Sequence, residues 1–376
     1  MTSELDQAAT AIAAGELTAL RESVGGLLAA RGTEADVRAA METPAGYDPA
    51  LWRQLADLGI AGLIVPAAYG GSGAGPVELE AVLEETGAAL LCSPLLGSSV
   101  LAAAVLTESG DRAAQAALLP PIADGSGIVA AAITGTAGQW AAGGVEVTAR
   151  ESGGGWALDG VADYVIGGQN AGTLLVAARE AAGLTWFVVA PGEAVITPLP
   201  TFDHTLRLAR VQLSGAAGAP LGERGGGWAV AERALNLARV ALAGEQAGGA
   251  RRSLDLTVAY AKARLQFGRP IGSFQAIKHM AADLLLEAES AISAARHAAR
   301  ELARDPAGAE LAIDLAAFAC ADAFTTVTAA SVQMHGGIAF TWEHPAHLYL
   351  RRARADAQLL GTPSFYRERY LQQLGG

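Results

Sequence analysis

The chain has few of the residues on which several common functions depend. Its only lysines are Lys262 and Lys278, and neither follows a glycine-rich loop, so a P-loop is not expected. No G-x-S-x-G sequence is present, which leaves acyl transfer by a serine nucleophile without support. The two cysteines, Cys92 and Cys320, are too few for a disulfide framework, and the simplest interpretation is a reducing cytoplasm.

Positive charge is also scarce. The formal net charge is −12, which argues against nucleic acid as a partner. An anionic ligand would need a local arginine cluster, and such a cluster is as often the solvated face of a helix. The chain offers two such clusters, Arg351 with Arg352 and Arg354, and Arg251 with Arg252.

Long apolar runs are absent as well. Hydrophobic residues make up 51% of the chain and charged residues 17%, which is typical of a heavily buried globular protein. No apolar run is long and uninterrupted enough to span a membrane. The N-terminus is acidic and has no basic region before an apolar segment, so no secretory signal is expected. We therefore expect a cytoplasmic protein without a membrane partner.

Metal-binding and dinucleotide-binding patterns are missing too. His344 and His347 lie three residues apart, but no cysteine or carboxylate cluster accompanies them, and a packing role is expected rather than a metal site. The glycine-rich loop at 70–75 lacks the third glycine of a dinucleotide fingerprint, and no strand–helix pattern surrounds it.

The pattern along the chain predicts an α+β fold with three domains. Residues 1–122 form a helical domain, 123–224 a small β-barrel or sandwich, and 225–376 a bundle of long helices. The middle region contains short apolar or alternating runs separated by glycine-rich turns. These runs are Gly127–Ile133, Val145–Ala149, Trp156–Leu158, Thr173–Ala178, Thr185–Val189, Val195–Pro198 and Leu208–Leu213.

One helix dominates the last domain. From Trp228 the chain runs about 35 residues without proline, and small or apolar residues occupy nearly every turn, which indicates a buried helix. Glu245 lies near its middle among alanine, leucine and glycine, where a carboxylate is costly unless something requires it. Further helices are predicted over Phe274–Arg304, over Ala309–His335 with a glycine C-cap, and within Trp342–Leu360.

Two segments of this domain resemble signatures of the acyl-CoA dehydrogenase family. The first reads Tyr260-Ala-Lys-Ala-Arg264-Leu-Gln266-Phe267-Gly268-Arg-Pro-Ile-Gly272-Ser-Phe274-Gln275, and the second Gln333-Met-His-Gly336-Gly337-Ile-Ala-Phe340-Thr. Both stand in the family's order and spacing. The order of helical, β and helical regions also fits the family's fold, and the resemblance covers essentially the whole chain.

The resemblance implies bound FAD, an acyl-CoA thioester substrate and α,β-dehydrogenation, with electrons passed to an electron-transfer flavoprotein. The physical chemistry of the motifs agrees, because an arginine can hold a pyrophosphate, a phenylalanine can stack on a flat ring, and paired glycines let the backbone approach a ligand. The implied FAD-binding residues are Arg264, Gln266, Phe267, Phe274, Gln333, Gly336, Gly337 and Thr362, and Arg239 is the implied substrate contact.

The family's catalytic base is where this chain departs from the pattern. Members commonly place Glu before Gly-Thr near the C-terminus, where this chain has Leu360, or on the long helix at the position of Ala238. Glu245 lies seven residues further on, two helical turns along the same face, and its apolar surroundings would give it the basicity that a general base needs. The alternative is a structural salt bridge from Glu245 to Arg239 or Arg252.

The middle domain departs as well, because Tyr164 and Ile166 stand where members often have Trp and Thr near the flavin.

Three functions therefore stay open. The chain is an active dehydrogenase, a non-catalytic partner subunit of a heteromeric dehydrogenase, or a flavin monooxygenase on the same fold. A purely structural helical protein is hard to reconcile with both motifs. In the family the Gln-x-x-Gly-Gly segment reaches the FAD of a neighbouring subunit, so the resemblance implies a homodimer, homotetramer or heterotetramer.

Overall fold

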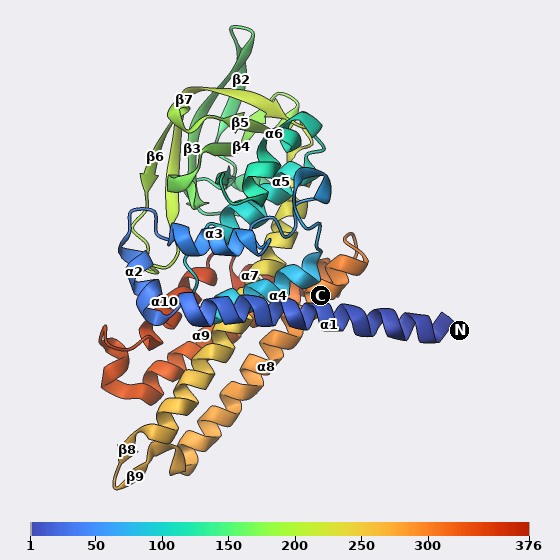
Figure 1. Ribbon diagram of the computed structural model, residues 1–376. Coiled ribbons are helices and arrows are strands. Elements are labelled where there is room, and N and C mark those ends of the chain that lie inside the picture. Colours follow the sequence, from blue (N-terminus) through green and yellow to red (C-terminus); the bar gives the residue numbers. More distant parts are fainter. Residues whose placement is uncertain (1, 376) are drawn as a thin grey trace.

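The N-terminal part of the chain is helical, as the sequence predicts. A computed structural model describes the backbone of residues 2–375 and the side chains of residues 15–375 (Figure 1). Helix α2 begins with a capping box, in which the Thr33 hydroxyl and the Asp36 carboxylate satisfy each other's backbone amides. The elements of this part are α1 (Thr2–Arg31), α2 (Glu34–Glu42), α3 (Pro49–Asp57), η1 (Ala67–Tyr69), α4 (Pro76–Ala88), η2 (Leu95–Ala102), α5 (Ala103–Glu108) and α6 (Arg112–Ala123).

The middle part is a small β-barrel with its own apolar core. Its strand order is β1-β4-β2-β3-β7-β5, β6 pairs with β7, and a further pairing of β4 with β5 closes the sheet on itself. The interior is filled by side chains such as Leu158, Phe187 and Val211, which alternate with outward residues along their strands. The elements are β1 (Val129–Ala132), η3 (Ala142–Gly144), β2 (Thr148–Ser152), β3 (Gly155–Ile166), η4 (Gly168–Asn170), β4 (Thr173–Glu180), β5 (Gly183–Val189), η5 (Pro191–Glu193), β6 (Ala194–Pro198) and β7 (Leu208–Leu221).

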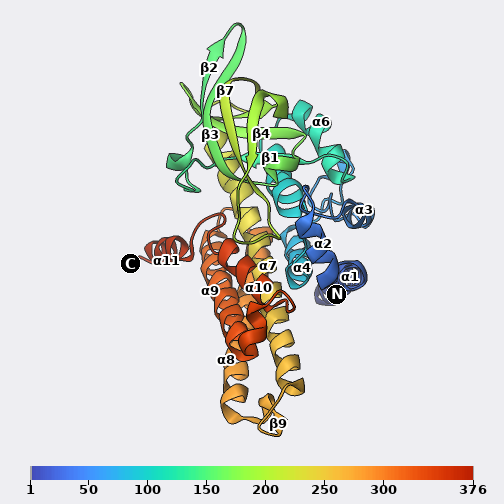
Figure 2. The same ribbon diagram turned by 90° about the vertical axis from the view of Figure 1, so that its left-hand side faces the viewer.

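The C-terminal part is a bundle built on one very long helix. Helix α7 (Gly227–Ala263) has 37 residues, or roughly 55 Å at about 1.5 Å per residue, and runs from the barrel to a hairpin at the far end of the molecule (Figures 1 and 2). The other elements are β8 (Leu265–Gln266), β9 (Arg269–Pro270), η6 (Ile271–Ser273), α8 (Gln275–Arg304), α9 (Glu310–His335), η7 (Gly336–Phe340), α10 (Ala346–Asp356) and α11 (Pro363–Gln373).

The predicted fold class is confirmed, since a helical region, a small β-barrel and a helical bundle follow one another along the chain. Each of the seven predicted strand segments overlaps an observed strand, although β3 and β7 are longer than predicted. The pairing of these two strands contains register shifts, which let a long strand bend around the barrel. The domain boundaries stay a prediction.

Small residues on α7 serve helix packing. A Cβ on Gly248 would lie 1.8 Å from the Glu84 carbonyl oxygen of α4, and one on Gly244 would lie 2.8 Å from the Glu80 carbonyl oxygen. The two helix backbones are therefore in direct contact where they cross. The small side chains along this face do not leave a wide channel between α4 and α7.

The expectation that no segment is long and apolar enough to cross a membrane is wrong by length and composition. Among the residues that the structure describes, one span, Glu310–Phe340, meets both criteria. This span is α9 with η7, and α9 packs against α7, α8, α10 and α11. Its contacts with these four helices explain its apolar composition, because a core helix passes the same test.

Candidate active site

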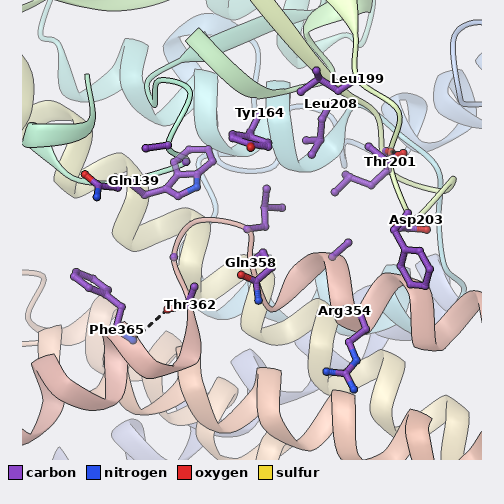
Figure 3. A pocket seen from close by; sticks show the side chains of 18 of the residues that line it. Gln139, Tyr164, Leu199, Thr201, Asp203, Leu208, Arg354, Gln358, Thr362 and Phe365 are labelled. Carbon is purple, nitrogen blue, oxygen red and sulfur yellow. Dashed lines mark hydrogen bonds between the residues drawn. The ribbon is translucent and has the colours of Figure 1, made fainter. Parts of the chain in front are cut away.

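A large cleft lies between the β-barrel and the C-terminal end of the chain. Its volume is about 880 Å³, within the range of about 300–1,000 Å³ that is usual for cofactor and ligand sites. Figure 3 shows Tyr164, Leu199 and Leu208 of the barrel on one side and Gln358 and Thr362 on the other. The cleft is also lined by Gln139, Trp140, Phe202, Asp203, Leu206, Arg354, Leu359 and Phe365.

The floor of the cleft is a tight turn between α10 and α11. Leu360 has a positive φ of 60°, a conformation that L side chains rarely adopt, and its side chain is 0% exposed within the apolar core. Its carbonyl oxygen accepts a hydrogen bond from the Tyr366 hydroxyl. The Thr362 hydroxyl then accepts from the Phe365 amide at 3.3 Å and caps α11. The family's usual position for the base therefore holds a buried leucine.

Arg239, the implied substrate contact, is bonded within the protein. Its Nε donates to the Tyr366 hydroxyl at 2.8 Å, and its Nη1 donates to the Asn236 amide oxygen at 2.6 Å. The guanidinium is buried and also lies over the Tyr366 ring. Arg239 thus anchors α11 to α7 beside the turn that holds Leu360.

Glu245 lies in charged surroundings rather than the apolar ones predicted. The Arg352 guanidinium of α10 donates to the Glu245 carboxylate, and the side chains of Arg352 and Glu245 are almost fully buried, at 3% and 9% exposed. Neither Arg239 nor Arg252, the partners considered from the sequence, forms this ion pair. Arg352 is 107 residues away from Glu245 in the chain. Arg352 belongs to the cluster for which the sequence leaves open an anion site or a solvated helix face, and it is buried.

Arg352 also bonds the loop between β6 and β7. Its Nε lies 2.8 Å from the Asp203 carboxylate, and its Nη2 donates to the Thr205 hydroxyl at 2.6 Å. Burial disfavours the charged guanidinium, but the Glu245 and Asp203 carboxylates hold the pKa of Arg352 well above its ordinary value. Since Asp203 lines the large cleft, this loop connects the cleft to the buried ion pair.

Asp356 is a buried acid that the sequence analysis missed. It is 2% exposed, and neither of its carboxylate oxygens has a hydrogen-bond partner among the described residues. Burial, and after it the nearby Glu245 carboxylate, raise the pKa of Asp356 well above its ordinary value. The signal in the sequence is the i, i+4 spacing of Arg352 and Asp356, which puts both on one face of α10.

A second, much smaller cavity lies at Glu245. Its volume is about 20 Å³, close to that of a single water, and it is lined by Thr205, Leu206, Glu245 and Arg352 together with apolar side chains of α4 and η2. Leu206 lines both this cavity and the large cleft. The two spaces are therefore neighbours, separated by Leu206 and by the loop that holds Arg352.

The first motif lies far from the cleft of its own chain. Arg264 follows Glu245 by 19 residues, or roughly 28 Å along α7 at about 1.5 Å per residue. Arg264, Gln266 and Phe267 are exposed on the β8–β9 hairpin, and Phe267 is 91% exposed with a positive φ of 53°. Phe274 is half-buried, 4.0 Å under the Arg269 guanidinium.

The second motif ends α9. Gln333, Gly336 and Gly337 are exposed, and Gly336 has a φ of 68°, so a glycine is required where α9 gives way to η7. Around this turn the His335 ring lies against Tyr260 and His344, with ring centroids 4.4 Å and 4.3 Å apart. Of the predicted site residues, only Thr362 lines the large cleft, and the functional roles of all of them, Thr362 included, stay predictions.

Comparisons with known proteins cover nearly the whole chain. The family "Acyl-CoA dehydrogenase, N-terminal domain" matches residues 14–126, and "Acyl-CoA dehydrogenase, C-terminal domain" matches residues 225–374. A curated relative, acyl-CoA dehydrogenase IpdE2 of Mycolicibacterium smegmatis, is 37% identical over 349 residues, which are 92% of this chain and 94% of the relative.

Two solved structures share the fold closely. The ChsE4-ChsE5 complex from Mycobacterium tuberculosis superimposes with a TM-score of 0.87 at 30% identity, covering 96% of this chain and 97% of the other. A variant of the Tcur3481-Tcur3483 steroid ACAD superimposes with a TM-score of 0.86 at 29% identity, covering 96% and 98%. Both structures are named for two components.

Proposed function

Because the chain belongs to the acyl-CoA dehydrogenase family, we propose that it takes part in the FAD-dependent α,β-dehydrogenation of an acyl-CoA thioester. The observation that carries this proposal is the cleft of about 880 Å³ between the barrel and the α10–α11 turn. When bound, FAD supplies the hydride acceptor for the β-hydrogen. An electron-transfer flavoprotein is the proposed electron acceptor, and the cytoplasm is the proposed location.

The residues around the cleft fit a flavin ring. The walls present the flat side chains of Trp140 and Tyr164, and a Cβ on Gly138 would lie 3.2 Å from the Tyr164 ring, so a side chain there would crowd this ring. Polar groups at Gln358 and Thr362 can bond the edge of a ring that carries amide groups. In the absence of the Trp and Thr that members often have, Tyr164 and backbone groups near Ile166 would position the ring.

The geometry supports a second chain as the source of the remaining part of this site. The hairpin that carries Arg264, Gln266 and Phe267 lies roughly 28 Å along α7 from Glu245 and cannot reach the cleft of its own chain. We therefore propose that the hairpin, and with it Gln333, Gly336 and Gly337, holds the pyrophosphate and adenosine of an FAD in a neighbouring chain. The exposed Phe267 would be covered by that neighbour.

The geometry favours a partner subunit whose base comes from another, related chain. Leu360 stands at the usual position of the family's base and Ala238 at the second position, and both are buried. Neither side chain has a basic group that could take an α-proton. Glu245 is bonded to Arg352, and the cavity beside it has room for about one water rather than an acyl chain. In this form the chain contributes the walls of the cleft and the hairpin, and a second chain contributes the carboxylate.

A second candidate is the active dehydrogenase in which Glu245 is the base. The observation in its favour is that Glu245 lines a cavity whose other walls include Leu91, Leu95 and Leu96, next to the large cleft. If Arg352 released it, the Glu245 carboxylate would be free to act as a general base. For this to occur, Arg352 and the loop at Asp203 must move away when an acyl group enters.

One experiment separates the two candidates. The chain is purified alone, its flavin content is measured, and a panel of acyl-CoAs is added anaerobically while flavin absorbance is followed. Glu245→Gln serves as the variant, and Glu232→Gln, on the same helix, serves as the control. Bleaching by the wild type that falls about 10²–10⁴-fold in Glu245→Gln alone supports Glu245 as the base. Bleaching only after co-expression with a related chain, and equally in both variants, supports the partner subunit. A protein that binds no flavin in any form would contradict both candidates.

A further inference from the structure

The ion pair of Glu245 and Arg352 is part of a cluster that contains more carboxyl groups than positively charged groups. Three carboxyl groups, those of Asp203, Glu245 and Asp356, surround the single guanidinium of Arg352, and all four side chains are buried. With every group ionised the cluster would carry two uncompensated negative charges in the protein interior. Such charges are costly to bury, so the cluster is expected to hold at least one proton.

The hydrogen bonds distinguish the three acids from one another. Arg352 donates to the carboxylates of both Glu245 and Asp203, while Asp356 receives no hydrogen bond from Arg352 or from any other described residue. Asp356 is nevertheless one helical turn from Arg352, on the same face of α10. An ionised aspartate at that distance would compete for the guanidinium.

Within the described part of the chain, no other charge near Asp356 offers it a partner. The groups that act on it are Glu245 of α7, Arg352 of its own helix and Asp203 of the loop before β7. The Cys92 thiol faces the same cluster, and burial raises its pKa to about 12, so it adds no negative charge at neutral pH.

We propose that Asp356 is protonated in the folded chain and acts as a positioning residue, leaving Arg352 to Glu245 and Asp203. In this arrangement Arg352 holds the loop of Asp203 and Thr205 against Glu245 and keeps the two cavities apart. Removal of the proton from Asp356 would create a third carboxylate that competes for the Arg352 guanidinium. The bond from Arg352 to Glu245 would then weaken. The proton on Asp356 therefore keeps Arg352 bonded to Glu245 and limits access to the Glu245 carboxylate.

The importance of this arrangement for dehydrogenation rests on the proposed function. The presence of the proton on Asp356 does not rest on it, so the experiment needs neither flavin nor acyl-CoA. Aspartate is labelled with ¹³C at the side-chain carboxyl, and the NMR signals of the whole chain are followed against pH. One aspartate signal is expected to remain protonated at pH 7, and Asp356→Asn should remove that signal while the fold is kept. If every aspartate signal has titrated by about pH 5, in the range of ordinary aspartates, the proposal is overturned without any variant.

Glu245→Gln provides the test of coupling. It removes the neighbouring like charge and makes Arg352 available, so the titration of Asp356 should shift to lower pH. An unchanged titration would mean that the acids do not share Arg352, and would overturn the positioning role. As a second readout, the unfolding free energy of Asp356→Asn should decline less steeply with rising pH than that of the wild type above the pKa of an ordinary aspartate, because Asp356 no longer adds to the decline that Glu80 causes. The same decline in both proteins counts against the proposal.

Discussion

Gly87 of α4 lies directly against the backbone of Glu245, and a Cβ on Gly87 would stand 2.0 Å from the Glu245 carbonyl oxygen. The position of the buried acid on α7 is therefore set by the crossing of the two helices as well as by its bond to Arg352. A side chain at Gly87 can be accommodated only if the helices move apart.

Gly87→Ala should therefore destabilise the fold by about 1–3 kcal/mol, because an added methyl group in a close-packed contact forces backbone shifts. Gly26 provides a matched control, since it lies in helix α1 with nothing within 4 Å of an added Cβ. Gly26→Ala should be stabilising by roughly 0.5–1 kcal/mol through helix propensity. Denaturant unfolding of both variants checks the pair, and equal effects would contradict the packing argument.

Arg264→Ala should strip flavin from the protein while leaving the fold intact. The side chain is exposed on the hairpin at the end of α7, so its removal costs little stability, whereas the loss of a charge-assisted contact to pyrophosphate weakens cofactor binding. Lys262→Ala, an exposed cation two residues earlier, is the control and should keep its flavin. Full flavin occupancy in Arg264→Ala, measured by absorbance, would count decisively against this role.

The flavin-loaded protein should be larger than the single chain of 38.1 kDa, because cleft and hairpin cannot meet within one chain. Phe267→Ser should shift light scattering toward smaller species, since Phe267 is exposed on the hairpin. Leu374→Ser, at an exposed position beyond α11, should leave the assembly unchanged. A flavin-loaded monomer would refute the prediction.

The buried carboxyl group of Glu80 should make the free energy of unfolding fall as the pH rises toward 8. Burial, followed by the nearby Glu84, raises the pKa of Glu80 to about 8, although Arg21 opposes the shift. The folded chain therefore holds a proton that the unfolded chain has released above about pH 4.3, and stability declines by about 1.4 kcal/mol per pH unit between these two values and not above them. Glu80→Gln should make the decline measured in unfolding experiments shallower by this contribution, and a parallel decline in both proteins would contradict the assignment.

Acid should loosen the turn after α9. Burial lowers the pKa of His335, His344 and His347, and Arg38 and Arg351 add repulsion at His347. The stability that these neutral rings contribute is fully present above about pH 6.5. It is lost as the pH falls through the lowered pKa values of the rings in the folded state. His344→Phe keeps a ring against His335 without a titrating group, so it should lose less stability than the wild type between pH 7 and pH 5. Thermal unfolding at the two pH values measures the difference, and an equal loss would exclude His344 from the effect.

The fold was predictable because it depends on local patterns. Strand segments such as Thr185–Val189 show their identity through β-branched and aromatic residues between glycines, and the long helix through the absence of proline over many turns. The partner of Glu245 was not predictable in this way. Arg239 and Arg252, the two partners expected from the sequence, lie on the same helix as Glu245, whereas Arg352 reaches Glu245 from an element 107 residues away. Pairings of this kind are decided by tertiary packing, which local periodicity does not contain.

The separation of the hairpin and the cleft along α7 also determines how mutations in two copies of the gene combine. In an assembly of the kind proposed, a lesion in the hairpin damages the flavin site of the neighbour, while a lesion in the cleft damages the site of the same chain. A cell with two gene copies, one altered at Arg264 and the other in the cleft, would build mixed particles in which one site combines an intact hairpin with an intact cleft. Such alleles would complement each other. The same two lesions placed in a single copy, with no wild-type copy present, would leave no site whole.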